Sequence, residues 1–235
     1  SKLTANAFLA QRISSINSIS ALCEATGAQI KEVSNAIGSD KRIGKKFLNA
    51  GPGFGGSCFQ KDILNLVYLC RFYGLPEAAD YWENVIYLNK WQRKRIANLI
   101  VDKFFGTVTD KKIVILGFAF KANTNDFRES PAYYISKELL ENGATLTIHD
   151  PKVSYKQINL ALKNISSKND FDSKFSCTND LNSAFENADA IVILTEWEEY
   201  KKINWNLAEK LMRKPAWIFD SRSLIDPEDI KKNNF

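Results

Sequence analysis

A cysteine that follows a run of glycines is the residue of this chain best suited to nucleophilic chemistry. Residues 51–58 read Gly-Pro-Gly-Phe-Gly-Gly-Ser-Cys, which is too rich in glycine for a regular helix or strand. Helical periodicity resumes at Phe59, so Cys58 is predicted to lie at a helix N-terminus, where free N–H groups and the helix dipole favour an anionic thiolate. Lys61 adds a cation in the first turn, and Asp62 could accept a proton from water.

An unreactive thiol is the alternative for Cys58, because most free cysteines behave as small buried hydrophobes, and the residues alone leave both interpretations open. Cys23, Cys70 and Cys177 are predicted to be buried thiols of that kind. The four cysteines are widely spaced and fit neither a zinc-ligand pattern nor a disulfide framework, which indicates a reducing compartment such as the cytoplasm. The single histidine, His149, excludes a site built from several histidines, and no metal is expected.

The composition is that of an ordinary globular protein and argues against two kinds of partner. Hydrophobic residues make up 45% of the 235 residues, and the net charge of +5 is spread among interspersed cations and anions. A nucleic-acid binder usually shows a more concentrated basic face. No apolar run approaches the ~20 residues that a membrane span requires. We therefore expect neither nucleic acid nor a membrane as a partner, whereas a small anionic ligand needs only a few cations.

The elements that must position these side chains change in character near residue 105. Before it, apolar residues recur at helical spacing, and they predict four helices. These helices cover residues 2–25, 30–37, 59–73 and 76–105. After it, apolar runs typical of buried parallel strands alternate with helices. The predicted strands cover residues 112–117, 144–150, 190–194 and 217–220, and the helices begin near Ser130 or cover 181–188 and 206–212.

This pattern predicts two domains in an α plus α/β arrangement. Residues 1–105 form an all-helical central domain, and residues 106–235 form a Rossmann-like domain with a parallel sheet and helices on both faces. Polar residues 163–174 are predicted to be a surface loop. The only methionine is Met212 and the helical pattern starts at once, so we expect further sequence upstream of Ser1.

The helical domain is also predicted to mediate self-association. No charged residue occurs between Ile13 and Cys23, and a helix without a charged face is usually buried on most sides. We hypothesise that this helix and the long helix after Pro76 form the subunit interface of a homo-oligomer, a dimer or a hexamer.

Several motifs, in order along nearly the whole chain, resemble those of the UDP-glucose/GDP-mannose dehydrogenase family. Residues 53–62, Gly-Phe-Gly-Gly-Ser-Cys-Phe-Gln-Lys-Asp, are similar to the nucleophile motif of its eukaryotic members. The remaining matches are the opening residues 2–8, residues 116–121 and 126–130 of the second domain, and the short motifs at 150–152, 195–197 and 219–220.

The resemblance implies NAD-dependent, four-electron oxidation of the C6 alcohol of UDP-glucose to the carboxylate of UDP-glucuronate. Cys58 would form a thiohemiacetal and then a thioester, which water hydrolyses. Lys2 and Asn6 would stabilise the oxyanion or hold a water, and Asp62 would assist proton transfer. Another nucleotide-sugar substrate such as GDP-mannose is one alternative. A non-catalytic nucleotide-sugar-binding module for oligomerisation is the other.

The resemblance also assigns residues to the substrate, which both domains would contact. It puts Phe47, Phe54, Gly55 and Phe59 around the nucleotide sugar, and Arg42 in the site of the neighbouring subunit. Phe120 and Lys121 would meet the uridine and the diphosphate, with Arg222 near the sugar or the phosphates. From the residues alone, solvated charges on loops are the favoured interpretation of Lys121 and Arg222. Their position after predicted strands, at the edge where α/β sheets bind ligands, narrows the difference.

For NAD, the resemblance implies contacts from Arg128 and Lys61 and a main binding site on an N-terminal domain outside this chain. The turn after the first predicted strand, Gly117-Phe-Ala-Phe-Lys-Ala, lacks the G-x-G-x-x-G fingerprint. Asp150, at the end of the second strand, resembles a ribose-binding acid. We therefore assign the second domain to the UDP-sugar and expect the chain by itself to be inactive.

Overall fold

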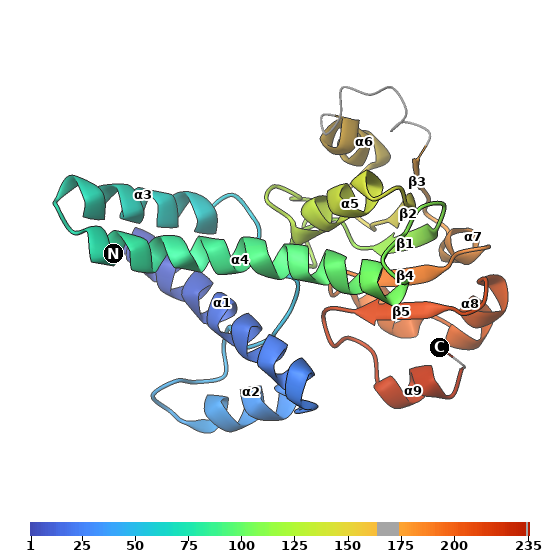
Figure 1. Ribbon diagram of the computed structural model, residues 1–235, viewed down its shortest axis with the longest axis horizontal. Helices are drawn as coiled ribbons and strands as arrows, with labels where there is room; N and C mark the ends of the chain where they lie inside the picture. Colours follow the sequence, from blue (N-terminus) through green and yellow to red (C-terminus); the bar gives the residue numbers. More distant parts are fainter. Residues whose placement is uncertain (164–173, 234) are drawn as a thin grey trace. The chain divides into compact units, whose positions relative to one another are not determined.

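The computed structural model describes residues 1–163, 174–233 and 235, which form two compact units, Ser1–Arg93 and Lys94–Phe235 (Figure 1). The division falls inside a helix, whereas the sequence analysis placed the domain boundary at residue 105. Most of the surface loop predicted over residues 163–174 lies outside the described residues.

The first unit consists of helices, as predicted. They are α1 (Lys2–Thr26), α2 (Ile30–Ser39), α3 (Phe59–Phe72) and the first part of α4 (Pro76–Lys103). Gly27 ends α1 in the left-handed conformation, at φ 77°. The fully buried Ala7 and Ala10 of α1 share a core with Ile63 and Val67 of α3, and small alanines let the two helices approach closely. This packing brings the N-terminal turns of α1 and α3 into one region.

The second unit contains a five-stranded sheet in which every paired strand is parallel, as predicted. Its strands are β1 (Lys112–Leu116), β2 (Thr145–His149), β3 (Phe175–Cys177), β4 (Ala190–Ile193) and β5 (Trp217–Asp220). The helices after them are α5 (Pro131–Glu141), α6 (Tyr155–Lys163), α7 (Leu181–Phe185), η2 (Glu198–Lys202), α8 (Trp205–Leu211) and α9 (Pro227–Lys231). The end of α4 also belongs here, with Ile96 and Ile100 in the core of this unit.

The strand order β3-β2-β1-β4-β5 creates a switch point between β1 and β4. From β1 the chain runs outward to β2 and β3, and from β4 it runs the opposite way to β5. Because such crossovers are right-handed, α5 and α6 cover one face of the sheet, and α7 and α8 cover the other (Figure 1). The carboxyl ends of β1 and β4 therefore border the crevice in which α/β sheets bind ligands.

Short elements account for the differences from the sequence prediction. The sequence analysis missed β3, α6, η2 and α9, of which β3 has three residues. A strand of this length has too few positions to show alternation, and it forms because Leu146 and Ile148 of β2 offer it hydrogen-bonding partners. Among the described residues, no helix has the length and apolar character needed to cross a membrane.

Candidate functional site

Cys58 occupies the N-cap of α3, as predicted, and its side chain is exposed. Its carbonyl accepts the first helical hydrogen bond, from the Asp62 amide at 2.9 Å. The Ser57 hydroxyl lies 3.8 Å from the Cys58 sulfur, within reach of a weak O–H···S contact. The thiol is therefore both accessible and next to the unsatisfied N–H groups of a fourteen-residue helix.

A short hydrogen bond joins two of the predicted catalytic residues. The Asn6 Nδ2 atom on α1 donates to Asp62 Oδ2 on α3 at 2.6 Å, across a sequence separation of 56 residues. Lys2 lies one helical turn before Asn6 and is exposed, while Lys61 next to Asp62 is also exposed. The first turns of two helices thus bring a carboxylate, a carboxamide and two ammonium groups to the same part of the unit as Cys58.

The loop before Cys58 is buried, and its aromatic residue packs on the start of α3. Phe54 is 4% exposed, and its ring meets the Phe59 ring edge-on at a centroid distance of 5.8 Å. Gly55 is buried as well. Three of the five residues of this unit assigned to the substrate therefore lie together, at residues 54, 55 and 59.

Side chains that the sequence analysis missed hold this loop. Asn17 of α1 and three residues of α4, Asn89, Gln92 and Arg93, hydrogen-bond to its backbone. The three α4 residues follow at i, i+3 and i+4, which places them on one helical face. The same helix buries Val85 and Ile86. Polar residues at helical spacing from these apolar positions were the sequence feature that could have revealed the loop contacts.

The structure gives Arg42 and Phe47 a different setting, in the loop between α2 and the glycine-rich segment. Arg42 pairs with Asp40 at 2.6 Å, and this hydrogen bond lowers the pKa of the Asp40 carboxyl. Phe47 is 40% exposed and has a left-handed backbone, at φ 61°. Arg12 stabilises the loop by donating to the carbonyls of residues 43, 44 and 46. Among the described residues, no hydrogen bond or ion pair joins Arg42 or Phe47 to Cys58.

In the second unit, Arg222 spans the switch point. Its Nε donates to Leu194 O, after β4, at 2.8 Å, and its Nη2 donates to Phe120 O, after β1, at 3.3 Å. Glu196 lies 3.1 Å from the same Nε. Burial lowers the pKa of Arg222, while the charges of Glu196 and Asp220 oppose the shift. Arg222 is therefore no solvated loop cation, since it ties two strand ends together.

Phe120 and Lys121 follow β1 at the same edge of the sheet. Phe120 is half-buried and Lys121 is exposed, with its Nζ 5.5 Å from the centroid of the Phe120 ring. Arg128 lies farther along this loop, and its guanidinium bonds to Asp126 at 2.8 and 2.9 Å. That side-chain hydrogen bond lowers the pKa of Asp126. An aromatic ring and cations at the edge of a switch point suit a base and a diphosphate.

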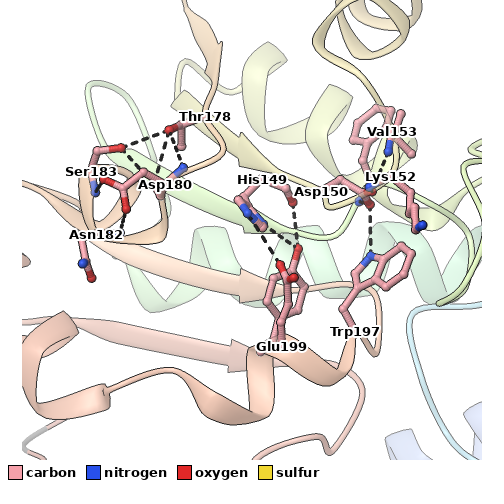
Figure 2. Close-up of polar contacts among 12 residues, drawn as sticks. His149, Asp150, Lys152, Val153, Thr178, Asp180, Asn182, Ser183, Trp197 and Glu199 are labelled. Atoms are coloured by element: carbon pink, nitrogen blue, oxygen red, sulfur yellow. Dashed lines mark hydrogen bonds and ion pairs between the residues drawn. The ribbon is translucent and has the colours of Figure 1, made fainter.

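The Asp150 carboxylate accepts hydrogen bonds from several loops at this edge of the sheet, and Figure 2 shows part of these contacts. Its Oδ2 accepts hydrogen bonds from the amides of Phe118 and Ala119 at 2.6 and 2.9 Å and from Trp197 Nε1 at 3.3 Å. Its Oδ1 accepts from the amides of Lys152 and Val153, both at 2.8 Å. Both oxygens are used within the protein, so the carboxylate that resembles a ribose-binding acid orders the loops after β1, β2 and β4.

His149 precedes Asp150 in the sequence, but its side chain contacts a different set of residues (Figure 2). Its Nδ1 is 3.0 Å from the Tyr200 hydroxyl, which in turn lies 3.0 Å from the His149 carbonyl. Glu199 Oε1 is 3.7 Å from the other ring nitrogen. Burial lowers the pKa of His149, although the charges of Glu199 and Asp150 oppose the shift.

The turn after β1 does not fit the pyrophosphate of NAD. In dinucleotide-binding domains, glycines here let backbone amides approach the phosphates. In this chain the amides of Phe118 and Ala119 already bind Asp150, and a Cβ on Gly117 would lie 2.3 Å from the Thr195 Cβ. Gly117, at φ 93°, thus accommodates the neighbouring loop instead of a phosphate. Among the residues that the structure describes, no group of three or more potential metal ligands occurs.

Two family models match the chain, one for each unit. The UDP-glucose/GDP-mannose dehydrogenase family, central domain, matches residues 1–91, and the UDP binding domain of the same family matches residues 114–227. UDP-glucose 6-dehydrogenase of Gallus gallus is 58% identical over 96% of this chain and 46% of its own length. UDP-glucose 6-dehydrogenase of Caenorhabditis elegans is 53% identical over 100% of this chain and 49% of its own.

The solved structures agree with these sequence matches. The UDP-glucose dehydrogenase of the archaeon Pyrobaculum islandicum superposes with a TM-score of 0.80 at 28% identity, over 99% of this chain and 48% of the archaeal one. The chain thus spans about half the length of the relatives that it matches. Both of its units match one family in the expected order, and this chain therefore belongs to the UDP-glucose/GDP-mannose dehydrogenase family.

Proposed function

We propose that this chain supplies the nucleophile and the UDP-sugar-binding part of a UDP-glucose 6-dehydrogenase. The observation that carries the proposal is the 2.6 Å hydrogen bond from Asn6 to Asp62, in the first turn of the helix whose N-cap is the exposed Cys58. A thiol nucleophile needs a neighbouring base and a group that stabilises an oxyanion. These residues offer all three functions.

In this mechanism the C6 alcohol first loses a hydride to the bound acceptor and a proton to water, which gives the aldehyde. Cys58 then acts as a thiolate and adds to this C6 aldehyde. Lys2 and Asn6 stabilise the oxygen anion of the resulting thiohemiacetal, because an ammonium and a carboxamide N–H both interact favourably with negative charge. Loss of a hydride from C6 converts this adduct to a thioester. Asp62 then accepts a proton from the water that attacks the thioester, and the released thiolate can react again.

The second unit would hold the nucleotide. Lys121 and Arg222 would balance the charge of the diphosphate, and Phe120 would contact the base. In the first unit Phe54, Gly55 and Phe59 would line the sugar side, while Phe47 and Arg42 belong to a separate loop, from which Arg42 would serve the site of a neighbouring subunit. The placement of Arg222 across the switch point supports the nucleotide assignment.

NAD⁺ supplies the hydride acceptor for both oxidation steps when it is bound. Because the turn after β1 does not fit its pyrophosphate, we propose that a domain outside this chain binds most of the cofactor. Lys61 and Arg128 are the cations of this chain that would contact it, and both are exposed.

Calorimetric titration of this chain with UDP-glucose and with GDP-mannose tests the nucleotide assignment. Selective binding of UDP-glucose that weakens at least tenfold in Lys121→Ala supports it. Lys152→Ala is the matched control, since Lys152 is an exposed lysine of a neighbouring loop. Selective binding of GDP-mannose would favour another substrate of the family, and binding of neither ligand would contradict the assignment.

The catalytic assignment is tested in the polypeptide that joins these residues to the NAD-binding domain. There, Cys58→Ala is expected to abolish UDP-glucuronate formation, while Cys70→Ala is expected to retain it. Turnover by Cys58→Ala near the wild-type rate would refute the nucleophile. A non-catalytic binding module predicts that result together with normal UDP-glucose binding.

We also propose that the helical unit forms a homo-oligomer in a reducing, cytoplasmic environment. Large apolar side chains at the junction of α3 and α4 are exposed, including Phe72 at 68% and Tyr73 at 71%. On α1, within the predicted interface segment, Leu22 is 59% exposed. All four cysteines are free, which agrees with a reducing environment. Sedimentation as a monomer at micromolar concentration would contradict self-association.

A further inference from the structure

The buried loop 51–56 obtains its hydrogen bonds mainly from side chains, and Asn89 makes the most specific contact. Asn89 is 1% exposed. Its Oδ1 accepts from the Phe54 amide at 2.8 Å, and its Nδ2 donates to the Phe54 carbonyl at 3.0 Å. Both backbone groups of one residue thus pair with one carboxamide, in the pattern that a neighbouring strand would offer. Only Asn and Gln carry a donor and a strong acceptor in such a group.

Gly53 makes room for this contact. A Cβ at Gly53 would lie 2.6 Å from Asn89 Oδ1, closer than a methyl group and an oxygen can approach. Gly53 also has φ 116°, a conformation that L side chains rarely adopt. Gly53 and Asn89 are therefore matched, since the absence of a side chain at one position admits the carboxamide at the other.

Neighbouring side chains complete the hydrogen bonding of the loop. Arg93 Nη2 donates to the Phe54 carbonyl at 2.6 Å. Gln92 Nε2 donates to the Gly51 carbonyl at 2.9 Å, and Asn17 Oδ1 accepts from the Gly51 amide at 2.8 Å. A buried backbone group that loses its hydrogen-bond partner is strongly destabilising. The loop therefore keeps this conformation only while α1 and α4 supply these partners.

The contact to Phe54 restricts the chain on one side of Cys58. The Phe54 ring packs on Phe59, the first residue of α3, so Phe54 and Phe59 are held at the two ends of a short segment. Cys58 lies within it. Losing the Asn89 contact would leave the Phe54 amide without its partner and the Phe54 carbonyl with Arg93 alone, which loosens this end and lets the thiol sample other positions.

We propose that Asn89 is a positioning residue for Cys58, because its paired hydrogen bonds to Phe54 fix the glycine-rich loop that presents the thiol. The inference rests on the proposed function. Asn89 does not touch the reacting atoms, and it acts through Phe54 and the loop. A misplacement of about 1 Å at a reacting group can lower a rate by about 100-fold. We therefore expect Asn89→Ala to lower kcat by about that factor. KM for UDP-glucose should rise by a smaller factor, because Phe54 and Gly55 would also line the sugar whereas the nucleotide contacts of the second unit are unchanged.

Four variants separate positioning from a general loss of stability. Asn89→Ala removes both hydrogen bonds, and Gly53→Ala forces the carboxamide away from the loop. Asn84→Ala is the control, because Asn84 is an exposed residue of α4 whose side chain donates to the Asp80 carbonyl of the same helix. Hydrogen exchange of the Phe54 amide reports the contact itself, and the melting temperature reports folding. Asn89→Gln, which keeps both functional groups on a longer side chain, should recover part of kcat.

The expected result is that Asn89→Ala and Gly53→Ala both accelerate Phe54 amide exchange at least tenfold and lower kcat, whereas Asn84→Ala does neither. Wild-type turnover in Asn89→Ala would overturn the inference. So would rapid exchange of the Phe54 amide in the wild-type chain, a measurement that needs no variant to fold. If Cys58→Ala retained turnover while the Phe54 amide was protected, the proposed function would fail and the loop contact would stand.

Discussion

Replacing Asp150 with asparagine should destabilise the α/β unit strongly, although the two side chains have nearly the same shape. Asp150 is 7% exposed, and it accepts hydrogen bonds from five donors. A carboxamide has one oxygen and one NH₂ group, so whichever way it turns, its NH₂ faces N–H donors. The less harmful orientation keeps the oxygen toward Phe118, Ala119 and Trp197 and turns the NH₂ toward two amides.

The size of the effect follows from these two lost bonds. A hydrogen bond to a charged group contributes about 1.5–3 kcal/mol, so the loss amounts to about 3–6 kcal/mol. A typical domain is stable by only about 5–15 kcal/mol, so Asp150→Asn should unfold at a much lower urea concentration than the wild type. Because Phe120 and Lys121 follow the two amides that Asp150 binds, UDP-glucose binding should weaken as well.

Urea unfolding followed by circular dichroism measures the loss, and amide exchange at Phe118 and Ala119 localises it. Asp180→Asn is the matched control. Asp180 is the exposed N-cap of α7, accepting from the amides of Asn182 and Ser183 (Figure 2), and asparagine serves equally well at an N-cap. The control should change stability by less than about 0.5 kcal/mol. A loss below about 1 kcal/mol in Asp150→Asn would refute the assigned role of the carboxylate.

Three further predictions concern single residues. Burial lowers the pKa of His149, so the folded protein binds a proton less readily than the unfolded chain. The contribution of neutral His149 to the free energy of unfolding is therefore fully present above about pH 6.5. It falls by up to about 1.4 kcal/mol per pH unit as the pH drops toward the folded pKa. Urea midpoints at pH 7.5 and 5.5 should show this loss in the wild type and less of it in His149→Gln. Desolvation of the half-buried Cys177 thiol raises its pKa to about 12, so iodoacetamide at pH 8 should label the exposed Cys58 well before Cys177 in peptide mass spectra; faster labelling of Cys177 would contradict this shift. Gly117→Ala places a Cβ 2.3 Å from that of Thr195 and should lower the melting temperature by several degrees, and an unchanged melting curve would be inconsistent with this close approach.

The periodicity of the sequence determined most of the secondary structure. The predicted helices over residues 2–25 and 59–73 correspond to α1 and α3, and Cys58 is at a helix start as expected. For these helices, local sequence features were sufficient to predict where they begin and end. Gly27 closes α1 because glycine adopts a left-handed backbone easily, and Ser130 caps α5 because its hydroxyl accepts from the Ala132 amide. Buried parallel strands are apolar throughout, so β1 and β4 were also evident.

Only the tertiary structure decided which polar side chains meet. Asn6 and Asp62 are 56 residues apart, and Asn89 and Phe54 are 35 apart. Such partners are set by the packing of helices, and no local pattern encodes it. Asp150 is the opposite case. Its position after a strand resembles that of a ligand-binding acid, but the tertiary structure uses its oxygens to bind backbone amides. The sequence thus determines which groups are available for chemistry, and the fold decides which of them remain free for a ligand, since buried polar groups must first satisfy one another.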